Sequence, residues 1–186
     1  MSTRNVSVDM SNPSTPVEPP GRRATAVAAA LVRLALGWIF LWAFLDKLFG
    51  LGRATPADRA WIDGGHPAQG YLKGVSAPDS ENPARGLFEF LSRQGWVDWL
   101  FMAALLGIGL GLLLGVALRV TAGATVLLMF FLWLASQPLE NNPFVDDHVI
   151  YALVAVWIAV ALAGDTLGLG RQWRRLPGVA DRPALW

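Results

Sequence analysis

The sequence contains no cysteine, and this absence excludes several classes of chemistry. Without thiols the chain forms no disulfides, no thiolate metal sites, no cysteine-ligated iron–sulfur clusters and no thiol-based catalytic relay. It is also poor in histidine, with two residues, and its formal net charge at pH 7 is only +1. Because no basic patch follows one predicted face, we expect no nucleic-acid partner.

Apolar residues, by contrast, are abundant. Hydrophobic residues make up 54% of the 186 residues, and the mean hydropathy is +0.42. A soluble domain of this size is usually less than half apolar, so the composition indicates a membrane protein. In lipid a helix pairs its own backbone polar groups, and about 20 residues cross the hydrocarbon core. The apolar runs therefore predict an all-α, four-helix transmembrane bundle with spans at about 24–49, 97–116, 120–136 and 148–164.

The segments outside these spans differ in character. Residues 1–23 are rich in Ser, Pro, Asn and Thr and are predicted to be a disordered tail, and residues 171–186 a second tail. The loop 51–95 is too long for a plain connector. It is expected to contain short helices, one of them starting with Asn82 as its N-cap. Leu87, Phe88 and Leu91 share a face there, which predicts a segment on the membrane surface or capping the bundle.

The distribution of basic residues predicts the orientation, because cytoplasmic loops carry the excess of Lys and Arg. Both termini are therefore expected in the cytoplasm, and the loop 51–95 outside, in a multi-pass protein of the plasma membrane. The basic residues on the cytoplasmic side are Arg22, Arg23, Arg119, Arg171, Arg174, Arg175 and Arg182.

Helix packing in membranes relies on small residues, which allow close approach. The second span offers such residues at Gly107, Gly111 and Gly115. In the fourth span a stripe of alanines continues to His148, so this side chain is expected to face the bundle, with Trp157 toward lipid. In the first span one face carries Arg33, Gly37, Phe40, Phe44 and Lys47, and Asp46 lies off that face.

Arg33 lies about two turns inside the first span, where a charge is costly unless it is paired. One interpretation is that its side chain snorkels to the interface. The other is a structural ion pair with Asp165, at the same depth of the fourth span.

The stretch "ENNPFVDDH" at the start of the fourth span raises a question of function. Asp146 and Asp147 suit the first turn of a helix, and Asn141, Asn142 or Asp146 suits its N-cap. The carboxylates therefore have a structural explanation. His148 is the stronger candidate for a site, since it faces inward at the depth of Lys47.

Three kinds of ligand can be weighed against these residues. Bis-histidine haem ligation would need His66 together with His148, and a metal held by His148 with either aspartate would lack a fixed third ligand. We expect neither haem nor metal. A quinone fits better, because its carbonyls require donors such as His148, Lys47 or Tyr151. Asp146 or Asp147 would relay the protons that its reduction consumes.

Two motifs resemble the DoxX-type membrane proteins. They are "RLALGWIFLWAFLDKLFG" in the first span and "NPFVDDHVIYALV" followed by "AGDTLGLGRQW" in the last, which looks like the DoxD branch. That branch includes the small subunit of thiosulfate:quinone oxidoreductase. The resemblance covers roughly residues 33–173 and implies a four-helix membrane fold and, in some members, electron delivery from sulfur compounds to quinone. The matching positions are Lys47, Asn142, Pro143, Asp146, His148 and Asp165, and Asp147 departs from the pattern.

The sequence thus leads to two main hypotheses. The first is the quinone-side membrane subunit of an oxidoreductase, with Lys47, Asn142, Tyr151 and His148 binding quinone and His148, Asp146 and Asp147 in catalysis. Lacking thiols, it would need a partner protein or a tightly bound cofactor to receive electrons from a donor such as thiosulfate. The expected partners are a redox subunit or a second copy of the chain in a homo-oligomer. The second is a non-enzymatic scaffold that anchors a redox or stress-response complex. A carrier is a third interpretation, which finds no support in an internal repeat.

Overall fold

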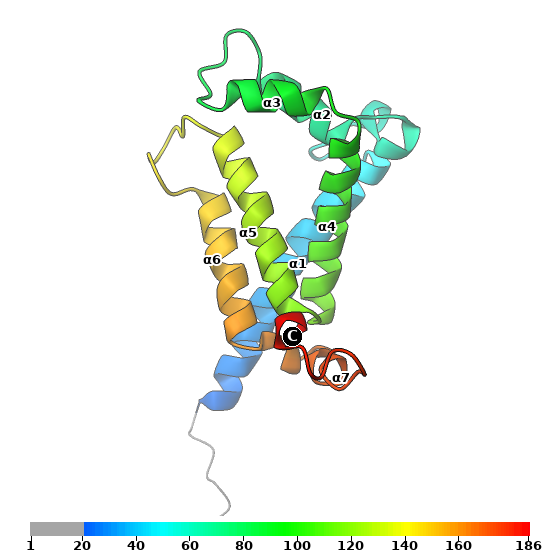
Figure 1. Ribbon diagram of the computed structural model, residues 1–186, viewed down its shortest axis with the longest axis vertical. Coiled ribbons are helices and arrows are strands. Elements are labelled where there is room, and N and C mark those ends of the chain that lie inside the picture. The colour runs from blue at the N-terminus through cyan, green and yellow to red at the C-terminus, as the bar shows by residue number, and fades with distance from the viewer. Residues whose placement is uncertain (1–20) are drawn as a thin grey trace, which may run out of the picture.

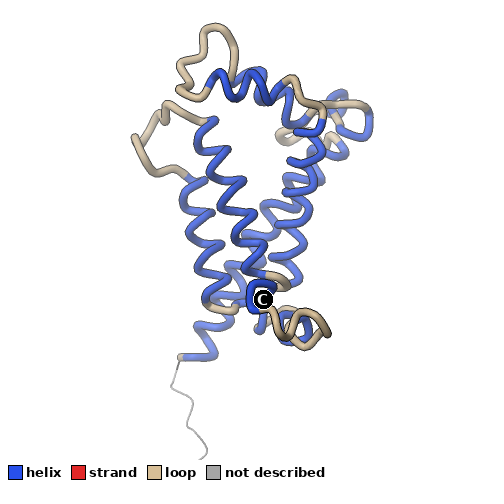
Figure 2. The backbone as a smooth tube through the Cα atoms, viewed as in Figure 1, coloured by secondary structure: helices blue, strands red, loops and turns tan. Residues whose placement is uncertain are grey.

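The computed structural model describes residues 21–186, and within them the chain is all-helical, with no strand. The predicted disordered tail lies mostly outside these residues. Figure 1 shows the order of the elements, and Figure 2 shows that loops are confined to the connections. The four longest helices are α1 (Arg22–Phe49), α4 (Trp96–Leu114), α5 (Leu118–Ala135) and α6 (Asp147–Val160). The shorter ones are η1 (Ala57–Arg59), η2 (Trp61–Asp63), α2 (Pro67–Val75), α3 (Arg85–Ser92), η3 (Ala163–Asp165), α7 (Gly170–Trp173) and η4 (Pro183–Leu185).

Three helices, α1, α4 and α5, are long and apolar enough to cross a membrane. Their length and composition indicate a lipid bilayer environment, as the sequence predicts. Helix α6 is also apolar but has only 14 residues. At 1.5 Å per residue it covers about 21 Å, less than the ~30 Å hydrocarbon core.

The long helices form two arms. Helix α1 packs most extensively on α4, and α5 packs most extensively on α6. The arms meet at one end of the molecule, where α1 begins and the chain ends, and they diverge toward the other end (Figure 1). Helices α2 and α3, which pack on each other, cross the open end, and we call them the lid.

Close helix contacts occur at glycines, although not all of those that the sequence suggests. A Cβ on Gly107 would meet nothing within 4 Å, so this predicted contact is wrong. Gly109 makes the close approach instead, since a Cβ there would lie 2.8 Å from the backbone nitrogen of Leu41 on α1. Gly115, with φ 71°, contacts Gly164: a Cβ on Gly115 would lie 2.8 Å from the Cα of Gly164. Spacing along one helix does not reveal which small residue meets the partner helix.

Arg33 joins the arms where they meet. Its side chain is fully buried, so the snorkelling interpretation is wrong. The guanidinium donates hydrogen bonds to the backbone carbonyls of Leu112, Leu113, Ala163, Thr166 and Leu167. Two of these carbonyls lie in the last turn of α4 and the other three in η3 and the turn after it, so one side chain joins the end of α4 to the segment that follows α6. We call this region the Arg33 end.

The predicted ion pair of Arg33 with Asp165 is also wrong. Asp165 Oδ2 instead accepts from Arg174 Nη2 at 2.6 Å, and this carboxylate raises the pKa of Arg174 above its usual value. Residues 171–186, predicted as a C-terminal tail, fold back on the helices, where the backbone N–H of Arg119 donates to the carbonyl of Trp186 at 2.7 Å. The Trp186 ring lies between the guanidinium groups of Arg119, 5.8 Å from its centre, and Arg174, 5.9 Å from it.

The lid is bonded to the second arm through a residue that the sequence places differently. Asn82 was expected to cap a lid helix, yet α3 begins at Arg85 with Ala84 as its N-cap. The Asn82 Oδ1 still accepts from the backbone N–H of Ala84 at 2.8 Å, one residue before α3. The buried amide nitrogen in addition donates to the carbonyls of Leu134, Ala135 and Gln137, at 2.9, 3.0 and 2.9 Å. The lid is therefore held at the C-terminal end of α5.

Candidate functional site

A cavity of about 1310 Å³ lies between the two arms beneath the lid. Its walls are mainly apolar and include Phe40, Leu105, Leu128 and Leu132. Three apolar lining residues, on α4 and α5, have exposed side chains: Leu100, Leu127 and Phe131. The polar lining lies on α1, α6 and the segment 54–73. A large apolar cavity with a few polar groups is the usual form of a small-molecule site.

Three of the residues predicted as ligand-binding line this one cavity: Lys47, His148 and Tyr151. Lys47 comes from the last turn of α1, and the other two come from the first turns of α6. On α6, Ala155 and Ala159 are buried and Trp157 is exposed, as the spacing predicts. The fold therefore brings together side chains that are about 100 residues apart in sequence.

Lys47 is half-buried and has no hydrogen-bond or ion-pair partner among residues 21–186. Its ammonium lies 6.0 Å from the centre of the Phe101 ring, a weak cation–π contact. The adjacent carboxylate of Asp46 is already engaged, because it accepts from the backbone N–H groups of Arg53 and Ala54 at 3.1 and 3.0 Å. Lys47 therefore keeps three donors for whatever occupies the cavity.

Asp46 itself is a structural residue that the helical face analysis missed. It lies off the face of Lys47, as expected, yet it is only 1% exposed. The turn after α1 folds over it and supplies the two N–H donors. A carboxylate in the last turn of an apolar span, just before a Gly-containing turn, was the signal available in the sequence.

Asp146 caps α6, one of the alternatives that the sequence offered, and it also contacts His148. Its Oδ1 accepts from the backbone N–H of Val149 at 3.3 Å and caps α6. Its Oδ2 lies 2.7 Å from His148 Nδ1. Burial acts to raise the pKa of Asp146, but the hydrogen bonds from the His148 side chain and the Val149 backbone outweigh it and lower the pKa below its usual value. The bond fixes the imidazole, and since Nδ1 is engaged, Nε2 is free for a ligand.

The remaining predicted residues do not line the cavity. Asp147 is exposed, with its Oδ1 at 3.6 Å from His148 Nδ1. Asn142 is exposed as well, and its Oδ1 accepts from the N–H groups of Phe144 and Val145, which is a turn rather than a ligand contact. Candidate ligand atoms of Asp146, Asp147 and His148 lie within 4.8 Å of one another. Because Nδ1 is already bonded to Asp146, we assign no metal to them.

His66 also lines the cavity, although the sequence offered it only as an unlikely haem ligand. Its Nδ1 lies 2.9 Å from Asp98 Oδ2. Asp98, in the first turn of α4, is buried and was missed, since an acidic residue at a helix start is usually explained by the helix dipole.

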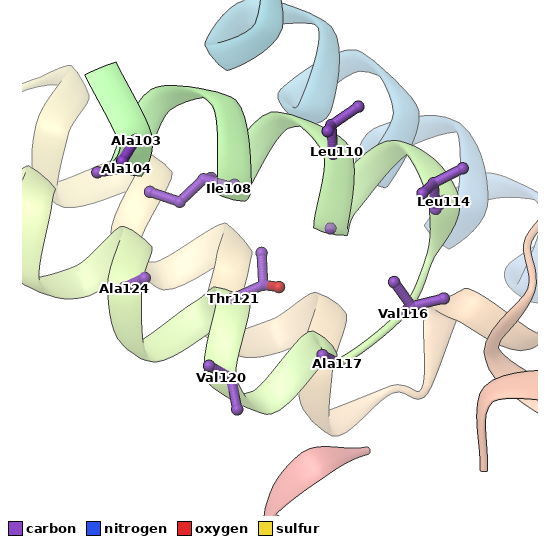
Figure 3. Close-up of a pocket in the computed structure, with 12 residues that line it drawn as sticks. Ala103, Ala104, Ile108, Leu110, Leu114, Val116, Ala117, Val120, Thr121 and Ala124 are labelled. Atoms are coloured by element: carbon purple, nitrogen blue, oxygen red, sulfur yellow. The ribbon is translucent and has the colours of Figure 1, made fainter. Parts of the chain in front are cut away.

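A second, smaller cavity of about 380 Å³ lies between α4 and α5 near their connection (Figure 3). Small and aliphatic residues line it, and Thr121 is the single polar side chain among them. It lacks the convergent polar groups of a ligand site. The cavity beneath the lid is therefore the candidate functional site.

No family model, curated protein or solved structure matches this chain.

Proposed function

We propose that the chain is an integral membrane subunit of a quinone-linked oxidoreductase, of the DoxX/DoxD type that its first-span and last-span motifs resemble. The observation that carries this proposal is the convergence of Lys47, His148 and Tyr151 on one largely apolar cavity. A quinone headgroup requires donors for its carbonyls and flat apolar walls for its ring. Its hydrocarbon chain requires access to lipid, and the exposed apolar lining residues Leu100, Leu127 and Phe131 would offer it a path between the arms.

Each polar residue has a distinct part in binding. The Lys47 ammonium, without a hydrogen-bond partner among residues 21–186, donates to a carbonyl oxygen. Tyr151 contributes a hydroxyl that donates or accepts. His148 Nε2 accepts from a quinol hydroxyl when the imidazole is neutral and donates to a quinone carbonyl when it is protonated, while Asp146 holds Nδ1. The bound quinone supplies the electron-accepting chemistry, and the chain supplies orientation and protons.

We further propose that α6 spans the membrane together with α1, α4 and α5. Its 14 residues are extended by the turn into η3, which the Arg33 hydrogen bonds hold in place. With α6 included, both ends of the described chain lie on one side and the lid on the other (Figure 1). The excess of arginine near the two ends supports a cytoplasmic location for them in the plasma membrane. Electrons would come from a partner redox subunit, with sulfur compounds such as thiosulfate as donors. A homo-oligomer of the chain is not required for this transfer.

The test is the content of the purified protein. The full chain, extracted in a mild detergent, is expected to retain quinone that solvent extraction and mass spectrometry identify. His148→Ala should lose most of it, while Asp147→Asn, the exposed neighbour, should retain it. A chain that carries no quinone and binds none from quinone-loaded nanodiscs would contradict the proposal.

A membrane scaffold is the second candidate, and the exposed apolar residues of α3 favour it. Leu87 is 43% exposed and Phe90 is 60% exposed on the lid, although Phe88 is buried beneath it. Under this function the double variant Leu87→Ser, Phe90→Ser releases a co-purifying protein while quinone content is unchanged. If partners are retained by that variant and also by a chain lacking residues 51–95, the lid is not a docking surface.

A further inference from the structure

The pair formed by His66 and Asp98 is the second carboxylate–imidazole pair of this chain. His66 Nδ1 lies 2.9 Å from Asp98 Oδ2, and His148 Nδ1 lies 2.7 Å from Asp146 Oδ2. Both histidines of the sequence are therefore held through Nδ1 by an aspartate, and both line the same cavity. In each pair an ionised carboxylate only accepts, so the neutral imidazole carries its proton on Nδ1 and presents Nε2 as a base.

A purely structural role explains Asp98 but not His66. Asp98 Oδ1 accepts from the backbone N–H groups of Ala68 and Gln69, at 2.8 and 3.0 Å, and so caps the start of α2. This cap uses one carboxylate oxygen and makes no use of the imidazole. The other oxygen, buried with the rest of Asp98, is directed to His66, whose Nε2 has no hydrogen-bond partner within the described part of the chain.

The two imidazoles differ in their access to solvent. The His66 side chain is 63% exposed, whereas the His148 side chain is 22% exposed. His66 lies at the start of α2, so it contacts both the solvent on the lid side and the cavity. The other charged or titratable groups that line the cavity are Lys47, Asp58, Arg59, Asp63, Tyr71, Lys73, His148 and Tyr151.

We propose that His66, positioned by Asp98, transfers protons between solvent and the ligand of the cavity, which rests on the quinone-binding function proposed above. Nε2 takes a proton from a hydronium ion of the solvent, which leaves a water molecule, and becomes imidazolium, whose charge the Asp98 carboxylate balances. The new Nε2–H bond then breaks as the proton passes to an oxygen atom of a quinone that has received electrons from the partner redox subunit, and the neutral imidazole is restored. Release of a proton from a ligand hydroxyl follows the same path in reverse. His148 binds the headgroup, and His66 connects it to water.

The first measurement is the tautomer of each imidazole by ¹⁵N NMR of the histidine-labelled full chain in detergent. With two histidines in the chain, the variants His66→Gln and His148→Gln assign all signals. We expect neutral His66 to carry its proton on Nδ1. In Asp98→Asn the amide oxygen retains the backbone cap and the amide N–H₂ donates to Nδ1, so the proton should move to Nε2. Asp146→Asn should move the proton of His148 and leave His66 unchanged.

The second measurement is the reactivity of Nε2 toward diethyl pyrocarbonate, with and without a short-chain ubiquinone or menaquinone at saturation. His66 should react faster than His148, and bound quinone should slow its modification. Quinone that binds without changing the reactivity of His66, or a His66 that carries its proton on Nε2 in the unmodified chain, would overturn this inference alone. If neither quinone binds, the proposed function fails, and this inference fails with it.

Discussion

Two of the cations on helix α1, Arg33 and Lys47, are held in opposite ways. Arg33 is fully buried and donates to five backbone carbonyls. Lys47, 14 residues further along and about 21 Å away, lines the cavity without a hydrogen-bond partner among residues 21–186. The first cation is fully used by the fold, and the second remains available.

The difference shows how to separate structural charges from functional ones in a helical membrane protein. A buried guanidinium has five donors in a fixed plane, which suits the clustered carbonyls of helix ends. An ammonium at the wall of a cavity is costly to desolvate unless something there accepts from it. Burial alone therefore does not identify a site; the number of donors left unsatisfied by the protein does.

The largest effect should come from removing the Arg33 side chain. Arg33→Met leaves several buried carbonyls without donors, at about 1–3 kcal/mol each, and should abolish assembly or lower the unfolding midpoint strongly in detergent. Arg33→Lys, with three donors, should fall between this variant and the original chain. Arg23→Met, exposed on the same helix, is the matched control. If Arg33→Met unfolds like the control, the Arg33 end is not what holds the arms together.

Asp46 sharpens the comparison, because it is structural although it directly precedes Lys47. Asp46→Ala should destabilise the chain by about 1–3 kcal/mol, since the N–H groups of Arg53 and Ala54 lose their acceptor. Chemical unfolding in detergent measures the change. Asp147→Ala, an exposed carboxylate, should have little effect. Equal losses from the two variants would show that burial of Asp46 is not important.

Lys47→Met should behave in the opposite way from Arg33→Met. The fold should be kept or slightly stabilised, because an ammonium without a hydrogen-bond partner is removed, while quinone binding weakens about tenfold, or 1.4 kcal/mol. Titration of a short-chain quinone into nanodiscs measures the affinity. Arg93→Met, exposed at the end of α3 and not part of the cavity lining, is the control. Unchanged affinity with reduced stability would place Lys47 with Arg33 as a structural cation.

The smallest effect concerns Asp146 and depends on pH. Asp146→Ala should cost about 0.5–2 kcal/mol at neutral pH through loss of the α6 cap. Because the pKa of Asp146 is lowered in the folded chain, its contribution is fully present above the unfolded value of about 3.9. It is lost as the pH falls through the folded value. The difference between variant and original chain should therefore disappear in strong acid, and a difference that persists there would assign the cap to another group.

Sequence periodicity was sufficient to place residues around each helix. In the fourth span His148 shares a face with the alanine stripe, and in the first span Lys47 shares a face with Phe40. The spacing alone therefore predicted that both faces point to the interior. Periodicity does not give the relative height or rotation of two helices. For that reason it favoured Gly107 over Gly109, and it suggested Asp165 rather than backbone carbonyls as the partner of Arg33.

Contacts between a loop and a distant helix were the hardest to predict. His66 and Asp98 are 32 residues apart, and Asn82 lies more than 50 residues from the carbonyls it bonds. Nothing in the local pattern distinguishes these residues from ordinary helix caps. Their partners depend on how the lid packs on the arms, which is a property of the whole fold.

The exposed apolar residues of the cavity lining, Leu100, Leu127 and Phe131, lie on the two apolar helices α4 and α5. With these helices in a bilayer, a hydrophobic ligand that enters past them would arrive by diffusion in the plane of the membrane. Its occupancy would then follow its mole fraction in the lipid rather than its concentration in water. The dissociation constants measured in micelles and in bilayers should accordingly agree only when the ligand concentration is expressed as a mole fraction of the detergent or the lipid.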